Sequence, residues 1–330
     1  MQELPLVSVI IPAFNARLHI GAALSSVLDQ DYPNLEIIVV DDGSSDETSK
    51  EALRYGERVR VIRQANAGPA AARNRGVSAS RGELLAFIDA DDVWIAGKLV
   101  AQVRYLREHP DVGVVFGAWI RWNASEDGTF GEPPRPSDYD EGLGIVEEES
   151  GWIYPQLLLD SAVWIVAALI RKELWNRLGG LDEALRIGEE YDFFLRASRI
   201  SRMVKLRRVV ACYRIHREST TQVVRPENNE YRVLLRAIKR FGVAGPDSQT
   251  VSPKRLRMRL FKLCVDHGYR HVRQGDACVA ARAFRDAVAH WPYSPRILAY
   301  FVLAHILCAI RGSRHATRGA AQHLDGRTGG

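Results

Sequence analysis

Three almost continuous apolar segments, each followed at once by polar or acidic residues, constrain the fold of this 330-residue chain more than any other feature. They read LVSVIIPAF at 6–14, LEIIVVDDGS at 35–44 and ELLAFIDADD at 83–92. Runs rich in Val, Ile and Leu without polar alternation are typical of strands that are buried on both faces of a sheet. The three segments therefore predict strands of a buried sheet.

Helical segments alternate with these strands. Apolar residues at helical spacing predict helices at 17–30, 46–56 and 69–80, and a short strand is expected at 58–64. Repeated strand–helix–strand units predict an α/β fold with a Rossmann-like, mostly parallel central sheet and flanking helices. In such sheets ligands bind beyond the carboxyl ends of the strands.

The same pattern resumes after a long irregular excursion. Residues 123–150 are rich in Pro, Gly and acidic residues and have no period, which is typical of a lid or a disordered insert. Strand-like sequence returns at 163–170 and at 203–216, and helices are expected between them at 171–179 and 188–200. We expect the strand at 203–216 to complete the α/β domain.

Charge divides the chain near residue 225. Residues 225–330 hold 19 Lys and Arg against 7 Asp and Glu, a net charge of +12, whereas residues 1–224 hold 26 against 33, a net charge of −7. We therefore expect an α/β domain at 1–224 and a smaller, basic α-helical region at 225–330. The apolar stretch from Ile297 to Ile310 is too short to span a bilayer, which leaves a buried terminal helix and an interfacial helix as alternatives.

The cysteines and the N-terminus bear on the cellular compartment. Cys212, Cys264, Cys278 and Cys308 form no CxxC pair, so neither a zinc site nor a disulfide framework is indicated and a reducing compartment is expected. The first residues, MQELPLVSVIIP, lack the basic segment of a signal peptide, and no apolar run is long enough for a membrane span. These features predict a cytoplasmic protein.

Carboxylates gather where two of the predicted strands end. Asp41 and Asp42 follow one strand, and Asp89, Asp91 and Asp92 follow another. If the strands are neighbours, these like charges face one crevice and require a counter-charge. A site rich in oxygen and free of sulfur suits Mg²⁺ or Mn²⁺, and such ions are commonly held by carboxylates together with substrate phosphates. The alternative is a solvated strand-to-helix turn.

Two phosphate-binding fingerprints are missing from the sequence. No GxGxxG follows the first strand and no GxxxxGK[ST] occurs anywhere, which argues against a dinucleotide site and a P-loop triphosphate site. A metal-bridged nucleotide diphosphate is the ligand that the acidic strand ends still favour.

Six motifs together resemble glycosyltransferase family 2, the inverting enzymes of GT-A fold. The resemblance covers about residues 6–220 and leaves the basic region outside it. The motifs are VSVIIPAFN, EIIVVDDGSSDET, NAGPAAARNRG, LLAFIDADDVW, GGLDEALRIGEEYDFFLRASR and YRIHRES.

The resemblance implies a nucleotide-sugar site in the first four motifs. Asp42, or its neighbour Asp41, is expected to accept a hydrogen bond from the uracil N3–H. Arg73 is expected to face the nucleotide, and Asp89 to reach the ribose hydroxyls. The full set of expected nucleotide-sugar-binding residues is Pro12, Phe14, Asn15, Asp41, Asp42, Arg73 and Asp89.

The resemblance also implies a divalent metal, Mn²⁺ or Mg²⁺, on the diphosphate. Asp91, in the DxD triplet that begins at Asp89, is the expected metal ligand. His216 lies where the family often carries a histidine near the metal, and neutral imidazole is a suitable ligand for Mn²⁺. A histidine that merely ends a strand is the alternative reading of His216.

The reaction implied is displacement at the anomeric carbon of a nucleotide sugar by an acceptor hydroxyl, which requires a general base. In the family the base is the aspartate of a Glu-Asp pair that precedes an aromatic helix. The pair here reads Glu189-Glu190, so the base position is Glu190, one methylene longer. Glu189 and Asp192 are alternates.

The leading interpretation is thus a metal-dependent glycosyltransferase that uses a nucleotide diphosphate sugar, preferably a UDP-sugar, in bacterial polysaccharide or cell-surface glycan synthesis. A catalytically inactive nucleotide-sugar-binding module of the same fold is the alternative, because the Glu-Glu pair departs from the family pattern. The acceptor is expected to be a glycan or a lipid-linked sugar. The basic region leaves a peripheral contact with the inner membrane face open, whereas no motif supports binding of nucleic acid.

Overall fold

The computed structural model describes residues 3–125, 129–134, 144–216, 223–274 and 276–325. The chain divides into two compact units, the first at 1–219 with 236–250 and the second at 220–235 with 251–330. Helix α8 (Asn229–Phe241) belongs in part to each unit. The boundary expected between residues 224 and 225 stays a prediction.

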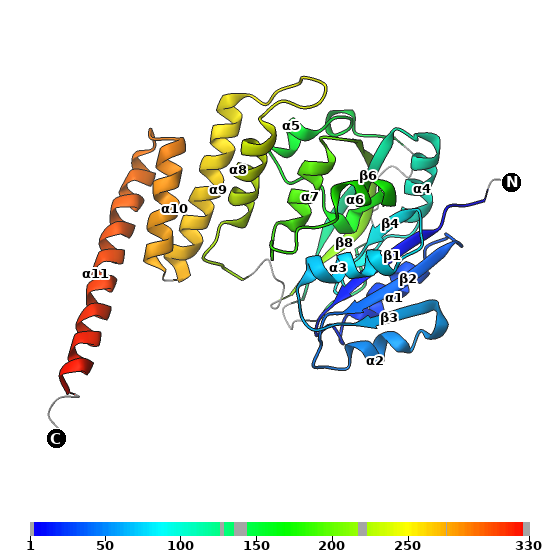
Figure 1. The fold of residues 1–330 in the computed structure, drawn as a ribbon, viewed down its shortest axis with the longest axis horizontal. Coiled ribbons are helices and arrows are strands. Elements are labelled where there is room, and N and C mark those ends of the chain that lie inside the picture. Colours follow the sequence, from blue (N-terminus) through cyan, green and yellow to red (C-terminus); the bar gives the residue numbers. More distant parts are fainter. Residues whose placement is uncertain (1–2, 126–128, 135–143, 217–222, 275, 326–330) are drawn as a thin grey trace. The chain divides into compact units, whose positions relative to one another are not determined.

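A mixed eight-stranded sheet forms the centre of the first unit, in the order β3-β2-β1-β4-β7-β6-β8-β5 (Figure 1). Four of its seven pairings are parallel, and the antiparallel ones involve β7 and β5. The predicted α/β fold is confirmed. The strands are β1 (Val7–Ala13), β2 (Leu35–Asp41), β3 (Val59–Arg63), β4 (Leu84–Phe87), β5 (Val93–Trp94), β6 (Val112–Asn123), β7 (Ala168–Arg171) and β8 (Arg202–Ile215).

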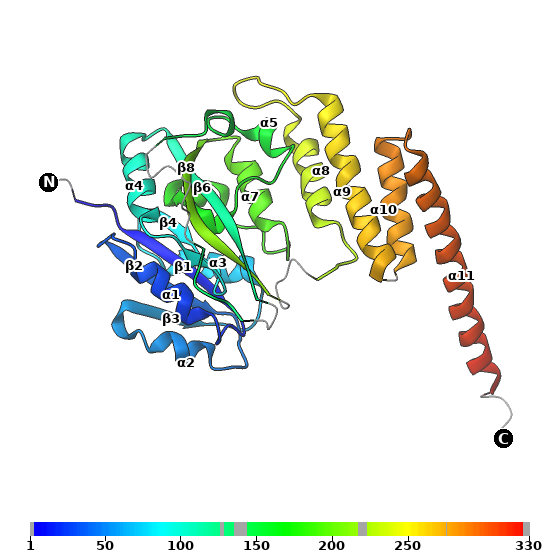
Figure 2. The same cartoon turned by 180° about the vertical axis from the view of Figure 1, so that it is seen from behind.

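Helices cover both faces of the parallel part of the sheet, which the two opposite views let the reader follow (Figure 1, Figure 2). Helix α3 (Pro69–Ala79) packs on β1 and β2 so closely that a Cβ on Gly76 would lie 2.3 Å from Ile10 Cγ2. Helix α1 (Ile20–Leu28) connects β1 to β2, and α2 (Thr48–Leu53) connects β2 to β3 in the same direction across the sheet. Helix α3 then connects β3 to β4 in the opposite direction, on the other side of β1. Right-handed crossovers therefore place α1 and α2 on the face opposite α3.

Four elements of the first unit did not appear among the sequence-based predictions, namely β5, β6, α4 (Lys98–Glu108) and α5 (Tyr154–Leu157). Strand β6 contains Gly113 and Gly117, which weaken the strand signal of its sequence. The structure explains Gly117, because a Cβ there would lie 2.7 Å from Val210 Cγ1 on the neighbouring β8. The remaining helices of this unit are α6 (Lys172–Leu178) and α7 (Glu189–Ala197).

The acidic excursion at 123–150 is partly outside the described residues, which omit 126–128 and 135–143. Within the described part, Phe130 packs edge-on against Trp122 with ring centroids 5.3 Å apart. An isolated bridge joins Ile145 to Leu206 on β8. The described ends of the excursion are therefore attached to β6 and β8.

Three further helices form the second unit together with part of α8: α9 (Pro253–Gln274), α10 (Ala277–His290) and α11 (Pro295–Asp325). The expected helical character of the C-terminal region is confirmed. Its core contains Cys264, Ala280, Ala281, Phe284, Ala287, Ile297 and Ala304.

A disulfide joins Cys278 on α10 to Cys308 on α11. The expectation that the cysteines form no disulfide was therefore wrong. The two residues are 30 positions apart in sequence, yet their Cα atoms lie 4.8 Å apart because α10 and α11 pack together. No local spacing pattern can reveal such a pair, since only tertiary packing brings the two helices together.

Helix α11 buries one face and exposes another. Ile297 and Ala304 are buried in the core of the second unit. Large apolar side chains line the exposed face, namely Leu298, Val302, Leu303, Ile306, Leu307 and Ile310. Among the residues that the structure describes, no helix has the length and hydropathy of a membrane span. The terminal helix thus combines features of the buried and the interfacial alternatives.

Candidate active site

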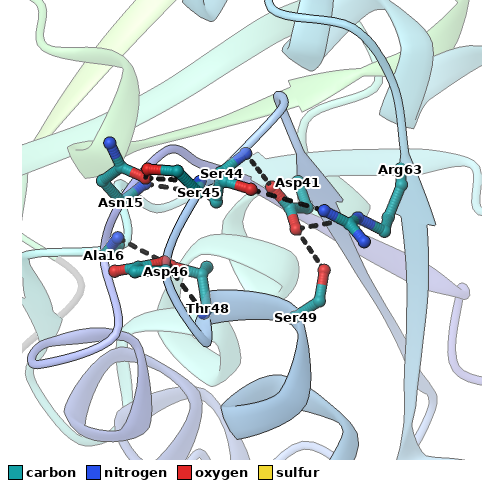
Figure 3. Close-up of polar contacts among 9 residues, drawn as sticks. All are labelled: Asn15, Ala16, Asp41, Ser44, Ser45, Asp46, Thr48, Ser49 and Arg63. Carbon is teal, nitrogen blue, oxygen red and sulfur yellow. Dashed lines mark hydrogen bonds and ion pairs between the residues drawn. The ribbon is translucent and has the colours of Figure 1, made fainter.

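The turn after β1 is fastened to the loop after β2 (Figure 3). Asn15 adopts a left-handed conformation with φ of 50°, which Asn tolerates better than most residues. Its backbone N–H donates to Ser44 Oγ over 3.0 Å, and its Oδ1 accepts from the Ser45 N–H over 2.9 Å. Phe14, just before it, is 54% exposed and lies beside the same strand ends. Two of the predicted nucleotide-binding residues thus lie in a turn that is held in place.

Asp41 is fully buried, and its carboxylate orders the loop that follows β2 (Figure 3). Oδ1 accepts from the Ser44 N–H over 2.8 Å, and Oδ2 accepts from the Ser49 hydroxyl. Arg63 Nε lies 3.3 Å from Oδ2. Burial alone disfavours the ionised form, but the hydrogen bonds from Ser49 and Ser44 and the charge of Arg63 bring the pKa of Asp41 below its ordinary value.

Asp42 is also buried, and its carboxylate braces the start of α3. It accepts from Gln64 Nε2 over 2.8 Å and from the backbone N–H groups of Ala67 and Gly68 over 2.9 and 2.8 Å. A carboxylate offers about four acceptor positions, so three internal donors leave room for one from a ligand. The structural role and the predicted base-recognition role of Asp42 are therefore compatible.

Both acidic strand ends lie at the same edge of the sheet. Strand β1 pairs in parallel with β2 on one side, with Ala13 opposite Asp41, and with β4 on the other, with Ile10 opposite Phe87. Asp42 follows β2 directly, and Asp89 and Asp91 follow β4 by a few residues. Because parallel neighbours end at a common edge, the carboxylates meet on one side of the sheet, as the sequence predicted.

Arg73, on α3, lies at the centre of a carboxylate cluster. Its side chain is 3% exposed, and Nη2 lies 2.6 Å from Asp89 Oδ1 and 3.0 Å from Glu190 Oε1. Nη1 lies 2.9 Å from Glu189 Oε1. Burial opposes the charge of Arg73, but the three carboxylates raise its pKa above the ordinary value. One buried cation thus joins the end of β4 to the start of α7.

The pKa of Glu190, the predicted base, lies well above the ordinary value of a glutamate. Burial raises its pKa to about 8, and the neighbouring charges of Glu189 and Asp89 add to the rise, while Arg73 opposes it. Its Oε2 accepts from the Ile165 N–H over 3.3 Å. Burial also raises the pKa of Glu189. Carboxyl groups that hold a proton near neutral pH can exchange it during a reaction.

Asp192, the other alternate for the base, lies two residues after Glu190 in the first turn of α7 and has different partners. Its Oδ2 is 2.7 Å from Arg196 Nε, and its Oδ1 is 3.5 Å from Arg236 Nη2. The described contacts do not bring Asp192 to the Arg73 cluster. It is engaged instead with arginines toward the other end of the helix.

The predicted metal-side residues lie together. His216 Nε2 is 2.9 Å from Asp91 Oδ2, with side chains 18% and 29% exposed. Asp92 is 1% exposed, and its Oδ2 has no hydrogen-bond partner among the described residues. Burial and the charges of Asp91 and Asp89 raise the pKa of Asp92 well above its ordinary value. The negative charge of these carboxylates is therefore only partly balanced by the positively charged side chains of the protein.

The donor set fits a divalent cation that shares its ligands with a phosphate group. Among the described residues, no group of three or more His, Cys, Asp or Glu side chains could hold a metal alone. Asp91 and His216 offer one oxygen and one nitrogen, which leaves most of the coordination sphere to substrate oxygens and water.

Arg214 and His19 also belong to this region, and the sequence analysis missed both. The Arg214 N–H donates to Asp92 Oδ1 over 2.8 Å, and its Nη1 lies 3.3 Å from His19 Nδ1. Its guanidinium carbon lies 4.2 Å from the centroid of the Trp122 ring. The sequence did contain a signal for Arg214. It lies two residues before His216, and alternate residues of an extended chain lie on the same side.

An aromatic cluster adjoins Glu190. The rings of Trp119 and Trp164 have centroids 5.3 Å apart, and Tyr213 lies 5.5 Å from Trp164. Trp164 directly precedes Ile165, whose N–H donates to Glu190. Trp119 is 38% exposed, so the cluster presents an aromatic surface close to the predicted base.

The mixed sheet with its flanking helices is a fold of GT-A type, and comparisons with known proteins identify the family. A model of the family "Glycosyl transferase family 2" matches residues 8–137. An uncharacterized glycosyltransferase of Rickettsia typhi is 32% identical over 232 residues, which are 70% of each protein. The chain therefore belongs to glycosyltransferase family 2 and is a glycosyltransferase.

A second relative is UDP-Glc:alpha-D-GlcNAc-diphosphoundecaprenol beta-1,3-glucosyltransferase WfgD of Escherichia coli. It is 38% identical over 133 residues, which cover 39% of this chain and 52% of WfgD.

Two solved structures share the fold. Staphylococcus aureus TarS 1–349 in complex with UDP-GlcNAc has a TM-score of 0.59 at 18% identity, over 92% of this chain and 88% of TarS. The mannosyltransferase PcManGT from Pyrobaculum calidifontis, in complex with GDP-Man and Mn²⁺, has a TM-score of 0.58 at 22% identity, over 96% of this chain and 84% of PcManGT.

Proposed function

We propose that this glycosyltransferase moves a sugar from a nucleotide diphosphate sugar, preferably a UDP-sugar, to an acceptor hydroxyl with inversion at the anomeric carbon. The observation that carries the proposal is the Arg73 cluster, which joins Asp89 to the Glu189-Glu190 pair. One buried arginine thereby links a residue expected to bind the nucleotide sugar, Asp89, to the predicted base, Glu190.

The donor is proposed to bind across the ends of β1, β2 and β4. The ordered turn at Phe14 and Asn15, the bonded carboxylates of Asp41 and Asp42, and Asp89 line this edge. Pro12 contributes rigid backbone just before the turn. A uridine donor is favoured because the name of WfgD specifies UDP-Glc and the TarS complex contains UDP-GlcNAc.

Glu190 is the proposed general base. Its carboxylate would accept the proton of the acceptor hydroxyl while that oxygen attacks the anomeric carbon and the bond to the diphosphate breaks. Arg73 holds Glu190 beside Asp89, so the base is positioned relative to the ribose side of the donor. Glu189 is the alternate, because Arg73 binds it equally closely.

Asp91 and His216 are the residues proposed to hold Mn²⁺ or Mg²⁺. Such an ion, when bound, supplies positive charge that stabilises the departing diphosphate. The excess of carboxylate at Asp91 and Asp92 supports this proposal, and the GT-A relative PcManGT was solved with Mn²⁺.

The acceptor is proposed to be a glycan or a lipid-linked sugar in bacterial polysaccharide or cell-surface glycan synthesis. The name of WfgD specifies a sugar on diphosphoundecaprenol as its acceptor. The aromatic cluster of Trp119, Trp164 and Tyr213 supports a sugar acceptor, because flat rings next to the base offer a surface on which a pyranose can lie.

A peripheral contact with the inner membrane face is proposed for the basic region at 225–330, in a protein that is otherwise cytoplasmic. The exposed apolar face of α11 and the net charge of +12 are the two features expected of a surface that meets anionic lipid. Flotation with phosphatidylglycerol vesicles tests the contact. Binding that is equal on neutral phosphatidylcholine vesicles would contradict it.

The second candidate, an inactive nucleotide-sugar-binding module, is favoured only by the Glu-Glu pair at the base position. A panel of nucleotide sugars, read as hydrolysis or transfer with and without Mn²⁺, separates the two candidates. We expect metal-dependent release of sugar from one donor. A module without activity would bind UDP and Mn²⁺ and release no sugar.

A further inference from the structure

A cavity of about 430 Å³ lies in the first unit at the opposite end of α7 from Glu190. Arg196 and Arg199 lie six and nine residues beyond Glu190, so roughly 9 to 14 Å of helical rise separates them from the proposed base. Five arginines line the cavity: Arg177, Arg196, Arg199, Arg236 and Arg240.

Carboxylates balance only part of this positive charge. Asp182 is the one acidic residue among the described residues that line the cavity, and its Oδ2 lies 2.8 Å from Arg236 Nη2. Asp192 adds a second carboxylate, which pairs with Arg196 and Arg236. Five guanidinium groups against two carboxylates leave a local charge of +3.

Several of the guanidinium groups are fixed before any ligand arrives. Arg196 donates to the carbonyl oxygens of Leu178 and Gly180 over 2.8 and 2.9 Å. Arg199 lies over the ring of Tyr154, with the guanidinium carbon 4.8 Å from the ring centroid. Groups that are already ordered lose little conformational entropy when they bind.

Two other arginines retain their hydrogen-bonding capacity. Within the described part of the chain, Arg177 and Arg240 have no carboxylate partner, and Arg240 lies over the ring of Phe241 at 4.9 Å. Structural ion pairing therefore does not account for their presence at the cavity.

We propose that this arginine cavity binds a phosphate or diphosphate group. The planar fork of guanidinium matches phosphate oxygens in a bidentate manner, and several forks around one cavity favour two linked phosphoryl groups. The volume lies within the range of ordinary ligand sites, and Ile200 and Phe241 offer apolar wall to whatever carries the phosphate. The site does not depend on the proposed transfer reaction.

Calorimetric titration with inorganic pyrophosphate in EDTA tests the proposal. Without a divalent cation, the carboxylates near Asp91 repel pyrophosphate, so binding reports the arginine cavity. The variant Arg177→Gln/Arg240→Gln is expected to bind at least about tenfold more weakly, since it removes two charged donors. The matched control, Arg58→Gln/Lys239→Gln, loses the same charge from two exposed residues that do not line the cavity, and should bind like the wild type.

Vesicles that carry phosphatidic acid, compared with phosphatidylcholine vesicles, distinguish a lipid phosphate from free diphosphate as the source. Competition by pyrophosphate against phosphatidic acid vesicles would assign the cavity to a lipid headgroup. The proposal is overturned if the wild type binds neither probe, or if both double variants lose affinity equally. Neither double variant removes a contact of Arg196, Arg199 or Arg236, so both are expected to keep the fold. Thermal unfolding of each variant checks this.

Discussion

The two ends of helix α7 carry opposite imbalances of charge. At its N-terminal end, Glu189, Glu190 and Asp89 surround the buried cation Arg73. Around its C-terminal end lie five arginines, two of which pair with the carboxylates of Asp182 and of Asp192, the latter in the first turn of the helix.

The helix dipole accounts for the sign at each end but not for the number of charges. Acidic groups are favoured near a helix N-terminus and basic groups near a C-terminus, each by less than about 2 kcal/mol. This dipole effect does not require a cluster of three carboxylates at one end or of five arginines at the other. An excess of one sign indicates a site whose counter-charge comes from a ligand.

The strongest test of the acidic end is Glu190→Gln. The amide keeps the shape of the side chain but cannot accept the proton, so we expect kcat to fall by about 10³-fold while donor affinity is retained. Glu190→Asp, which restores a carboxylate, should recover much of the rate. Transfer at the wild-type rate by Glu190→Gln, measured with the best donor of the panel, would show that the base lies elsewhere.

Removal of the proposed metal ligand should have the next largest effect. We expect Asp91→Ala to lower metal-dependent turnover by about 10²-fold and to weaken Mn²⁺ binding, because Asp91 is the proposed carboxylate ligand of the ion. Titration of Mn²⁺ in the presence of UDP measures this directly. Unchanged Mn²⁺ affinity and rate in Asp91→Ala, with an unchanged melting temperature, would contradict the metal assignment.

The pH dependence of the reaction follows from the proton affinity of Glu190. A base acts in its deprotonated form, and a carboxyl group with a pKa of about 8 is mostly protonated at pH 7. We therefore expect kcat/KM to rise as the pH increases through about 8, by about tenfold between pH 7 and pH 9. A profile that is flat above pH 6 would show that no group with such a pKa limits the reaction.

The acidic end could largely be predicted from the sequence, because its signals are local. Asp41 and Asp42 lie at the end of one strand, and Asp89 and Asp91 follow the end of another within a few residues. Parallel strands bring such residues to one edge of the sheet. The grouping of Arg73 with Glu189 could not be derived from spacing, since 116 residues separate them and only the packing of α3 near α7 brings them together.

Features that depend on tertiary packing escaped the sequence analysis. Strand β6 was missed because its Gly117, which allows the close approach of β8, weakens the strand signal. The Cys278–Cys308 bridge was missed because it depends on the packing of α10 on α11. The arginine cavity draws on α6, α7 and α8, and no single segment contains more than two of its arginines.

Asp192 lies between the two ends of α7, and its substitution separates them. Asp192→Asn removes a charge that pairs with Arg196 and Arg236, so we expect a loss of about 1 to 2 kcal/mol in the free energy of unfolding. The rate of transfer should change by less than about threefold, because Asp192 contacts neither Arg73 nor Glu190 among the described residues. Pyrophosphate affinity at the arginine cavity should rise, since one of its two counter-charges is gone. Denaturant unfolding, transfer kinetics and titration on one preparation measure all three. A large loss of rate with little loss of stability would instead give the role of base to Asp192, and the acidic end would then extend further along the helix than the contacts of Arg73 indicate.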